Sequence, residues 1–223
     1  MLYNLLTPFA EDYLFFNLFR YLTFRTGGAV MTALFISFII APPMIRWLKK
    51  KQKQGQPIRS DGPETHFSKA GTPTMGGLMI LISVTVSTLL WADLSNAFVW
   101  YALLVMVGYG LIGFGDDYLK LTKRNTNGLP GKLKLCAQFV IGFVATVGIM
   151  EVLPGNLNMH VAIPFFKHMF IYIWWFFPIW ALLVIVGSSN AVNLTDGLDG
   201  LAIVPVAIAA ACFALIAYLV GRA

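Results

Sequence analysis

Long runs of residues without Asp, Glu, Lys or Arg are the feature that most constrains the fold of this chain. A helix needs about 20 mostly apolar residues to cross the hydrocarbon core of a bilayer. Strands of a transmembrane barrel would instead alternate polar and apolar residues over about ten positions. The unbroken runs therefore predict an all-α, polytopic bundle of about six transmembrane helices, forming one membrane domain over residues 1–223, with spans at 26–45, 75–92, 97–115, 133–150, 170–188 and 201–220.

The amount and placement of charge support this reading and predict an orientation. Charged residues make up 12% of the chain, against about 25% in an ordinary soluble domain. The net charge of +6 does not indicate nucleic acid, because the basic residues concentrate in the expected loops 46–74 and 116–132. By the positive-inside rule these loops are cytoplasmic and the N-terminus is periplasmic. Counting spans places loop 189–200 on the cytoplasmic side as well, so three polar loops are expected at one membrane face.

The first motif is GFGDDYLK, which places Asp116 and Asp117 at the end of the third expected span. A helix C-terminus disfavours negative charge by roughly 0.3–1 kcal/mol, and adjacent carboxylates repel each other. Lys120 lies one turn onward, a spacing that contributes only about 0.2–0.5 kcal/mol. A divalent cation or its phosphate complex would compensate more fully. The simpler alternative is a solvated helix end with a local ion pair.

The second motif is NAVNLTDGLDG, in which a polar residue recurs at every third position: Asn190, Asn193, Asp196 and Asp199. In a regular α-helix, steps of three would spread these side chains over half the circumference. A 3₁₀ turn, or a helix broken at Gly197 and Gly200, would instead bring them into one pocket. The alternative is a set of Asx turns that close a helix without any ligand.

The third motif is PETHFSKAGTPTMGG, which combines Lys69, hydroxyl groups and the entry to the second span. A lysine, hydroxyls and free amides at a helix N-terminus suit phosphate. The order of residues is not that of a Walker A loop, and an ordinary turn is the alternative. A further pair, Gly128 and Gly131 around Pro130, predicts only a loop turn. Together the motifs favour hard oxygen ligands for magnesium or manganese, and phosphate chemistry.

In this order and on these loops, FSKAGTPTMGG, GFGDDYLK and NAVNLTDGLDGLA resemble the phospho-N-acetylmuramoyl-pentapeptide transferases, which belong to the polyprenyl-phosphate N-acetylhexosamine-1-phosphate transferase superfamily. The resemblance implies transfer of phospho-MurNAc-pentapeptide from its UDP carrier to undecaprenyl phosphate, with Mg²⁺, forming lipid I and UMP. It also implies a multi-pass protein of the bacterial inner membrane whose active site faces the cytoplasm, and it leaves a homodimer open.

The resemblance further implies roles for individual residues. Asp116 would be a base or an orienting group for the lipid phosphate, and Asp117 beside it would serve the metal or the diphosphate, so that both are candidate metal ligands. Gly197, Leu198 and Asp199 match the uracil pocket of the family. The positions that match the nucleotide-sugar and diphosphate region are Lys69, Thr74, Asn190, Asn193 and Asp196. Lys120 and Lys132 would be neighbours of phosphate.

Family members have ten spans, and the six expected here predict a chain truncated after six of ten helices. Such a fragment would lack a later aspartate loop that supplies a metal ligand and a histidine-rich loop, and we expect it to be inactive alone. Three alternatives stay open, one of which is a non-catalytic membrane scaffold whose motifs would be only surface loops. A related polyprenyl-phosphate GlcNAc-1-phosphate transferase would share the aspartate pair more than the third motif, and an ion-coupled membrane transporter would need ionisable residues near the bilayer midplane.

Overall fold

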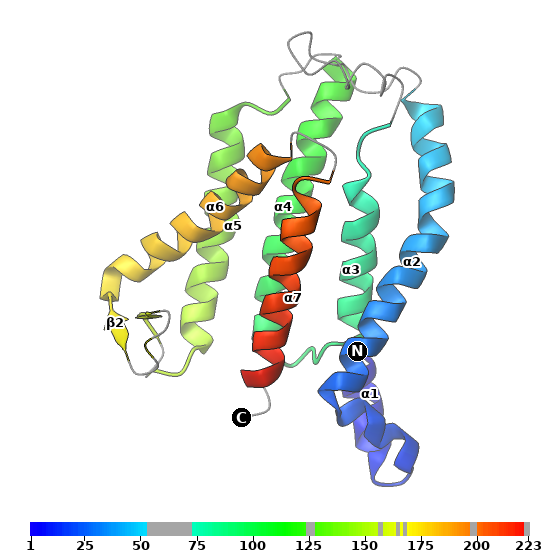
Figure 1. Ribbon diagram of the computed structural model, residues 1–223, viewed down its shortest axis with the longest axis vertical. Coiled ribbons are helices and arrows are strands. Elements are labelled where there is room, and N and C mark those ends of the chain that lie inside the picture. Colours follow the sequence, from blue (N-terminus) through cyan, green and yellow to red (C-terminus); the bar gives the residue numbers. More distant parts are fainter. Residues whose placement is uncertain are drawn as a thin grey trace. The chain divides into compact units, whose positions relative to one another are not determined.

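The computed structural model describes residues 1–52, 73–123, 128–155, 158–163, 166, 169–196 and 200–220. We expected a single membrane domain, but the chain divides into two compact units, Met1–Val152 and Leu153–Ala223. Each unit is described by itself, and Figure 1 gives the labels of their helices and strands.

All regular secondary structure among the described residues of the first unit is helical. It opens with three short turns, α1 (Leu2–Leu6), η1 (Thr7–Ala10) and η2 (Leu14–Arg20). Four longer helices follow, each packed against the next one along the chain: α2 (Leu22–Lys51), α3 (Gly77–Trp91), α4 (Ala97–Lys123) and α5 (Gly131–Val152). Because successive helices run in opposite directions, the ends of α2 and α4 and the starts of α3 and α5 lie at the same end of this unit (Figure 1).

The second unit combines a small hairpin with two helices. The strands β1 (His160–Ala162) and β2 (Phe170–Tyr172) pair antiparallel, with His160 opposite Tyr172. A 3₁₀ turn, η4 (Trp174–Phe176), leads into α6 (Phe177–Thr195), and α7 (Ile203–Val220) follows. The predicted all-α class is therefore confirmed, with this hairpin as a minor exception.

Among the described residues, five helical segments are long and apolar enough to cross a membrane: Leu22–Lys51, Ala97–Lys123, Gly131–Val152, Trp174–Thr195 and Ile203–Val220. The chain is thus a multi-pass membrane protein. The remaining expected span, 75–92, is observed as α3, which has 15 residues. At 1.5 Å per residue such a helix is about 22 Å long, shorter than the roughly 30 Å hydrocarbon core.

The helix ends differ from those predicted, because a charged residue ends an apolar run without ending the helix. In the structure α2 continues to Lys51 and α4 continues to Lys123, so residues 46–51 and 116–123 are helical rather than loops. The predicted span 170–188 was wrong at both ends, since 170–172 form a strand and α6 runs from Phe177 to Thr195. Charge limits how far a helix is embedded in lipid, but it does not stop helix propagation.

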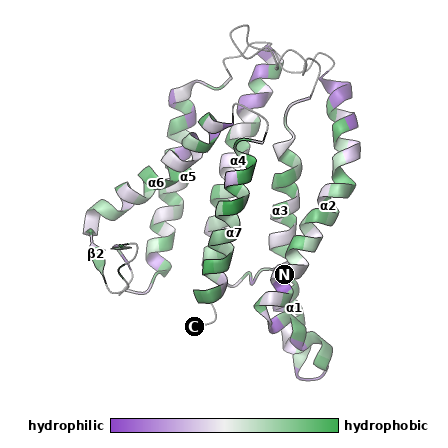
Figure 2. Cartoon of the chain, in the orientation of Figure 1, coloured by the Kyte–Doolittle hydropathy of each residue, from purple (hydrophilic) through white to green (hydrophobic). Residues whose placement is uncertain are grey.

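Hydrophilic residues gather at one end of the first unit, where α2 and α4 end and α5 begins (Figure 2). The last turn of α2 carries three lysines, and the last turn of α4 carries two. The middle of each helix is apolar.

Small residues allow close packing of α2 against α3. A Cβ added at Gly28 would collide with the indole ring of Trp91, whose Nε1 donates a hydrogen bond to Thr32 Oγ1 at 2.9 Å. Ser87 on α3 donates to the carbonyl oxygen of Ala29 on α2 at 2.5 Å. Apolar side chains gain little by leaving lipid for a protein interior, so membrane helices associate through such contacts.

Replacing Gly28 with alanine is expected to destabilise the first unit by about 1–3 kcal/mol, the usual cost of an overpacked site. The indole of Trp91 has little room to move, because it also stacks on Phe19 with ring centroids 5.8 Å apart. The matched control is Gly27→Ala, since no atom lies within 4 Å of a Cβ at that position. Thermal unfolding in detergent measures both variants, and equal melting temperatures would contradict this account of the packing.

Candidate functional site

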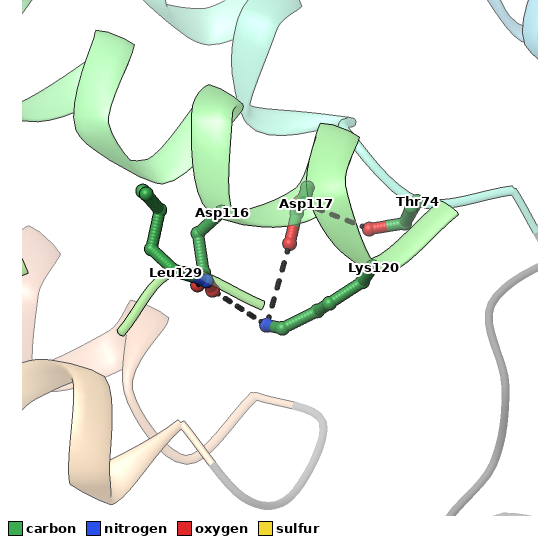
Figure 3. Close-up of polar contacts among 5 residues, drawn as sticks. All are labelled: Thr74, Asp116, Asp117, Lys120 and Leu129. Carbon is green, nitrogen blue, oxygen red and sulfur yellow. Dashed lines mark hydrogen bonds and ion pairs between the residues drawn. The ribbon is translucent and has the colours of Figure 1, made fainter. Parts of the chain in front are cut away.

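Asp116 and Asp117 lie on α4 and share Lys120 as a cationic partner. Lys120 Nζ is 2.6 Å from Asp116 Oδ2 and 3.7 Å from Asp117 Oδ1. All three side chains are partly buried, and they point toward one another in Figure 3. The spacing predicted the ion pair with Lys120, and the structure brings both carboxylates to it.

The expected unfavourable helix dipole at this pair is corrected by the structure. We placed both carboxylates at the C-terminus of the third span, but α4 continues beyond them to Lys123. The dipole effect falls off within the last turn, and in α4 that turn carries Lys120 and Lys123. Charge repulsion between the two carboxylates is therefore the main reason that they need a cation.

Thr74 joins the carboxylates from the segment that precedes α3. Its hydroxyl donates a hydrogen bond to Asp117 Oδ2 at 3.0 Å (Figure 3). Gln52, at the end of α2, holds the backbone of Thr74 from both sides. Its Oε1 accepts from Thr74 N–H at 2.9 Å, and its Nε2 donates to the Thr74 carbonyl oxygen at 3.3 Å. The end of α2 thus fixes the residue that orients Asp117.

Asp116 is held in addition by the connection before α5. The backbone N–H of Leu129 donates to Asp116 Oδ1 at 2.7 Å. Since Lys120 contacts the other oxygen, both oxygens of Asp116 are engaged, each from a different direction. Hydrogen bonds to charged groups contribute about 1.5–3 kcal/mol each, so this carboxylate is firmly oriented.

The donor set suits a hard divalent cation. Two carboxylates flank the ammonium group of Lys120, and the Thr74 hydroxyl contacts the second oxygen of Asp117. Such oxygens are typical ligands of magnesium. In the part of the chain that the structure describes, no third His, Cys, Asp or Glu joins the pair to form a metal-binding group. A cation held by these two carboxylates would need its remaining ligands from substrate, water or another segment.

The second motif is partly described, within the second unit. Asn190 and Asn193 lie in the regular α-helix α6, which ends at Thr195, so a 3₁₀ turn over these residues was wrong. Asn190 Nδ2 donates to the carbonyl oxygen of Val186 at 2.8 Å, and Asp196 caps the helix through its backbone N–H. Gly200 has a φ of 82°, which agrees with a turn after the helix.

The remaining predicted site residues are placed as follows. Lys132 is exposed in the first turn of α5. Lys69, Gly197, Leu198 and Asp199 lie outside the described residues.

Sequence reasoning missed Gln52, Gly128 and Leu129 as parts of the site. The Gln52 side chain holds the backbone of Thr74, and Leu129 holds Asp116 through its own backbone N–H. Backbone groups are shared by nearly all residue types, so the sequence does not indicate these contacts. Gly128 did leave a signal, since a glycine close to a functional loop is often there for its backbone conformation.

Comparison with known proteins gives consistent results across the chain. Residues 99–223 match the family model described as glycosyl transferase family 4, and residues 69–81 match the phospho-N-acetylmuramoyl-pentapeptide-transferase signature 1. The chain is 60% identical over its whole length to the phospho-N-acetylmuramoyl-pentapeptide-transferase of Granulibacter bethesdensis. It is 56% identical to the protein of that name from Maricaulis maris over 229 aligned residues. It spans 62% of the length of each of these relatives.

Proposed function

This chain belongs to the phospho-N-acetylmuramoyl-pentapeptide transferases of glycosyl transferase family 4, and from that premise we propose that the whole protein forms lipid I. Phospho-MurNAc-pentapeptide would pass from UDP-MurNAc-pentapeptide to undecaprenyl phosphate, with release of UMP. The observation that carries the proposal is the cluster of Thr74, Asp116, Asp117 and Lys120, which joins the signature segment to the matched family region.

In the proposed reaction, an oxygen of the lipid phosphate forms a bond to the phosphorus attached to the sugar. The bond from that phosphorus to the oxygen it shares with UMP breaks, and UMP leaves with the electron pair. Little covalent chemistry falls to the protein, so its contribution is positioning and charge compensation. The lysine side chains near the carboxylates at this end of the unit would help to hold the anionic substrates.

The two carboxylates are suited to different tasks. Asp116 has both oxygens engaged by Leu129 and Lys120, which favours an orienting role over that of a base. Asp117 is held by Thr74 at one oxygen, while the other is 3.7 Å from Lys120 and is the more available for a metal. Magnesium bound there would neutralise developing charge on the diphosphate. Lys120 would then be displaced toward a phosphate oxygen.

We further propose that the site faces the cytoplasm of a bacterial inner membrane. The lysine-rich ends of α2 and α4, and the start of α5, lie at the same end of the first unit as the carboxylates. Positive charge of this kind marks the cytoplasmic side of membrane proteins. Nucleotide-activated sugars are water-soluble, and this placement would give them access to Asp117.

The residues of the second motif, Asn190, Asn193 and Asp196 together with 197–199, would contribute to the nucleotide side of the site. Lys69 and Lys132 would add positive charge near the diphosphate. These roles follow from the family, and separate substitutions at each position would test them.

The full-length protein, purified in detergent, tests the proposed function directly. Radiolabelled UDP-MurNAc-pentapeptide, undecaprenyl phosphate and Mg²⁺ are expected to give labelled lipid I and one UMP per product. UDP-GlcNAc serves as the competing donor. Transfer from UDP-GlcNAc alone would favour the related GlcNAc-1-phosphate transferase, and transfer from neither donor would overturn the proposal.

Replacing Thr74 with valine is expected to slow lipid I formation by about 10-fold or more, since a hydrogen bond to a charged group contributes about 1.5–3 kcal/mol. Valine keeps the shape of threonine but cannot donate to Asp117. The matched variant Thr74→Ser keeps the hydroxyl and should stay within about threefold of the wild-type rate. Initial rates of lipid I formation measure the difference. A valine variant as active as the serine variant would show that the Thr74 hydroxyl does not contribute to the site.

A further inference from the structure

Gly128 has a backbone conformation and surroundings that only glycine tolerates. Its φ is 56°, in the left-handed region that L side chains rarely adopt. A Cβ at this position would collide with Asp116 Oδ1 and would lie 2.8 Å from Lys120 Cε and 3.0 Å from Asp116 Cγ. The backbone at residue 128 therefore lies directly against the ion pair.

The close approach has a consequence for Asp116. Immediately after Gly128, the N–H of Leu129 donates to Asp116 Oδ1 at 2.7 Å. A side chain at residue 128 would push the segment away from α4, and the N–H could then no longer reach the carboxylate. Asp116 would then keep only the contact of its other oxygen with Lys120, which is drawn in Figure 3.

We infer that Gly128 is a positioning residue of the transferase site, which acts by letting the Leu129 amide hold Asp116 in its orientation beside Asp117. The inference rests on the proposed function and deepens it, because it assigns a task to the connection between α4 and α5. Gly128 itself touches no substrate in this account. It sets the direction of a carboxylate that does.

The decisive comparison is between two glycines three positions apart in the full-length protein. Gly128→Ala is expected to lower kcat for lipid I formation about 10- to 100-fold, the effect of displacing a positioned charged group. The KM for UDP-MurNAc-pentapeptide should change less than about threefold, because nucleotide binding does not depend on Asp116 orientation. Gly131→Ala is the matched control, since no atom lies within 4 Å of a Cβ there, and it should keep wild-type kinetics.

A second variant removes the hydrogen bond without adding any atom. In cell-free synthesis, Leu129 can be replaced by its α-hydroxy analogue, which turns the backbone N–H into an ester oxygen. The proposal expects this variant to lose kcat as Gly128→Ala does, by about 10-fold or more.

The outcomes separate a positioning role from a folding role and from failure of the proposed function. Loss of kcat in Gly128→Ala and in the ester variant, with unchanged melting temperature and KM, would support the inference. A Gly128→Ala variant with wild-type kcat, an ester variant with wild-type kcat, or an equal loss in Gly131→Ala would overturn it. If the wild-type protein itself formed no lipid I, the proposed function would fail, whereas active wild type with unaffected variants would refute only the inference.

Discussion

Lipid I formation by the full-length protein is expected to fall about 100- to 1,000-fold when Asp117 is replaced by asparagine, which is the usual effect of removing a group that stabilises charge in the transition state. Asparagine keeps the size of the side chain, and its amide oxygen can still accept a hydrogen bond from Thr74. The negative charge is lost, however, and with it the more available ligand for a divalent cation. Initial rates with radiolabelled UDP-MurNAc-pentapeptide measure the change.

Asp93→Asn provides the matched control for this prediction. Asp93 lies between α3 and α4, at the opposite end of the first unit from Asp117, and it accepts hydrogen bonds from Ser95 and Asn4. Its replacement should leave the rate within about twofold of wild type, since it touches none of the site residues. A fully active Asp117→Asn protein would show that Asp117 has no role in the reaction. An equal loss of rate in Asp117→Asn and Asp93→Asn would show that the assay reports loss of folded protein rather than loss of a site residue.

Removing divalent cations from the full-length protein should abolish lipid I formation, with a loss of at least about 100-fold, because neutralising charge on a transferred phosphoryl group is the largest task at such a site. Mg²⁺ added back is expected to restore the rate, and Mn²⁺ should replace it, since both prefer oxygen ligands in octahedral geometry. Titration of Mg²⁺ into EDTA-treated protein gives the concentration for half-maximal rate.

The same titration on Thr74→Val links the cation to the described residues. If Thr74 orients Asp117 for the metal, this variant should need several times more Mg²⁺ for its half-maximal rate, whereas Asp93→Asn should not. A protein that keeps its full rate in EDTA would contradict the magnesium proposal and would leave charge compensation to Lys120 and its neighbours.

The all-α class and the approximate places of the longer helices could be predicted from the sequence because lipid allows few alternatives. An apolar run long enough to span a bilayer must satisfy its backbone hydrogen bonds within itself, and the helix is the structure that does so. The ends could not be predicted in the same way. Arg46, Asp116 and Asn190 interrupt the apolar pattern, but nothing in their chemistry breaks a helix, and α2, α4 and α6 continue past them.

The candidate site could be predicted only where its parts are close in sequence. The pair Asp116 and Lys120 follows from spacing along one helix, and the structure shows it at 2.6 Å. The contact from Thr74 to Asp117 joins residues far apart in the chain. The sequence indicated each of them as a candidate site residue but did not predict that they are in contact. Gln52 binds the backbone of Thr74, and Leu129 donates its own backbone N–H to Asp116. No pattern of side chains in the sequence reveals such contacts.

The glycines between the helices of the first unit show that hydropathy is a poor guide to what this membrane domain accepts. At Gly148 on α5 the site of a Cβ is filled by the Tyr101 ring of α4, and at Gly108 on α4 it is filled by Ile141 of α5. Leucine at either position would make the helix more lipid-soluble and would still force the pair apart. The harm done by natural variants that replace these glycines with larger apolar residues should therefore be ranked by the volume of the new side chain. A score based on membrane insertion alone would class such variants as harmless.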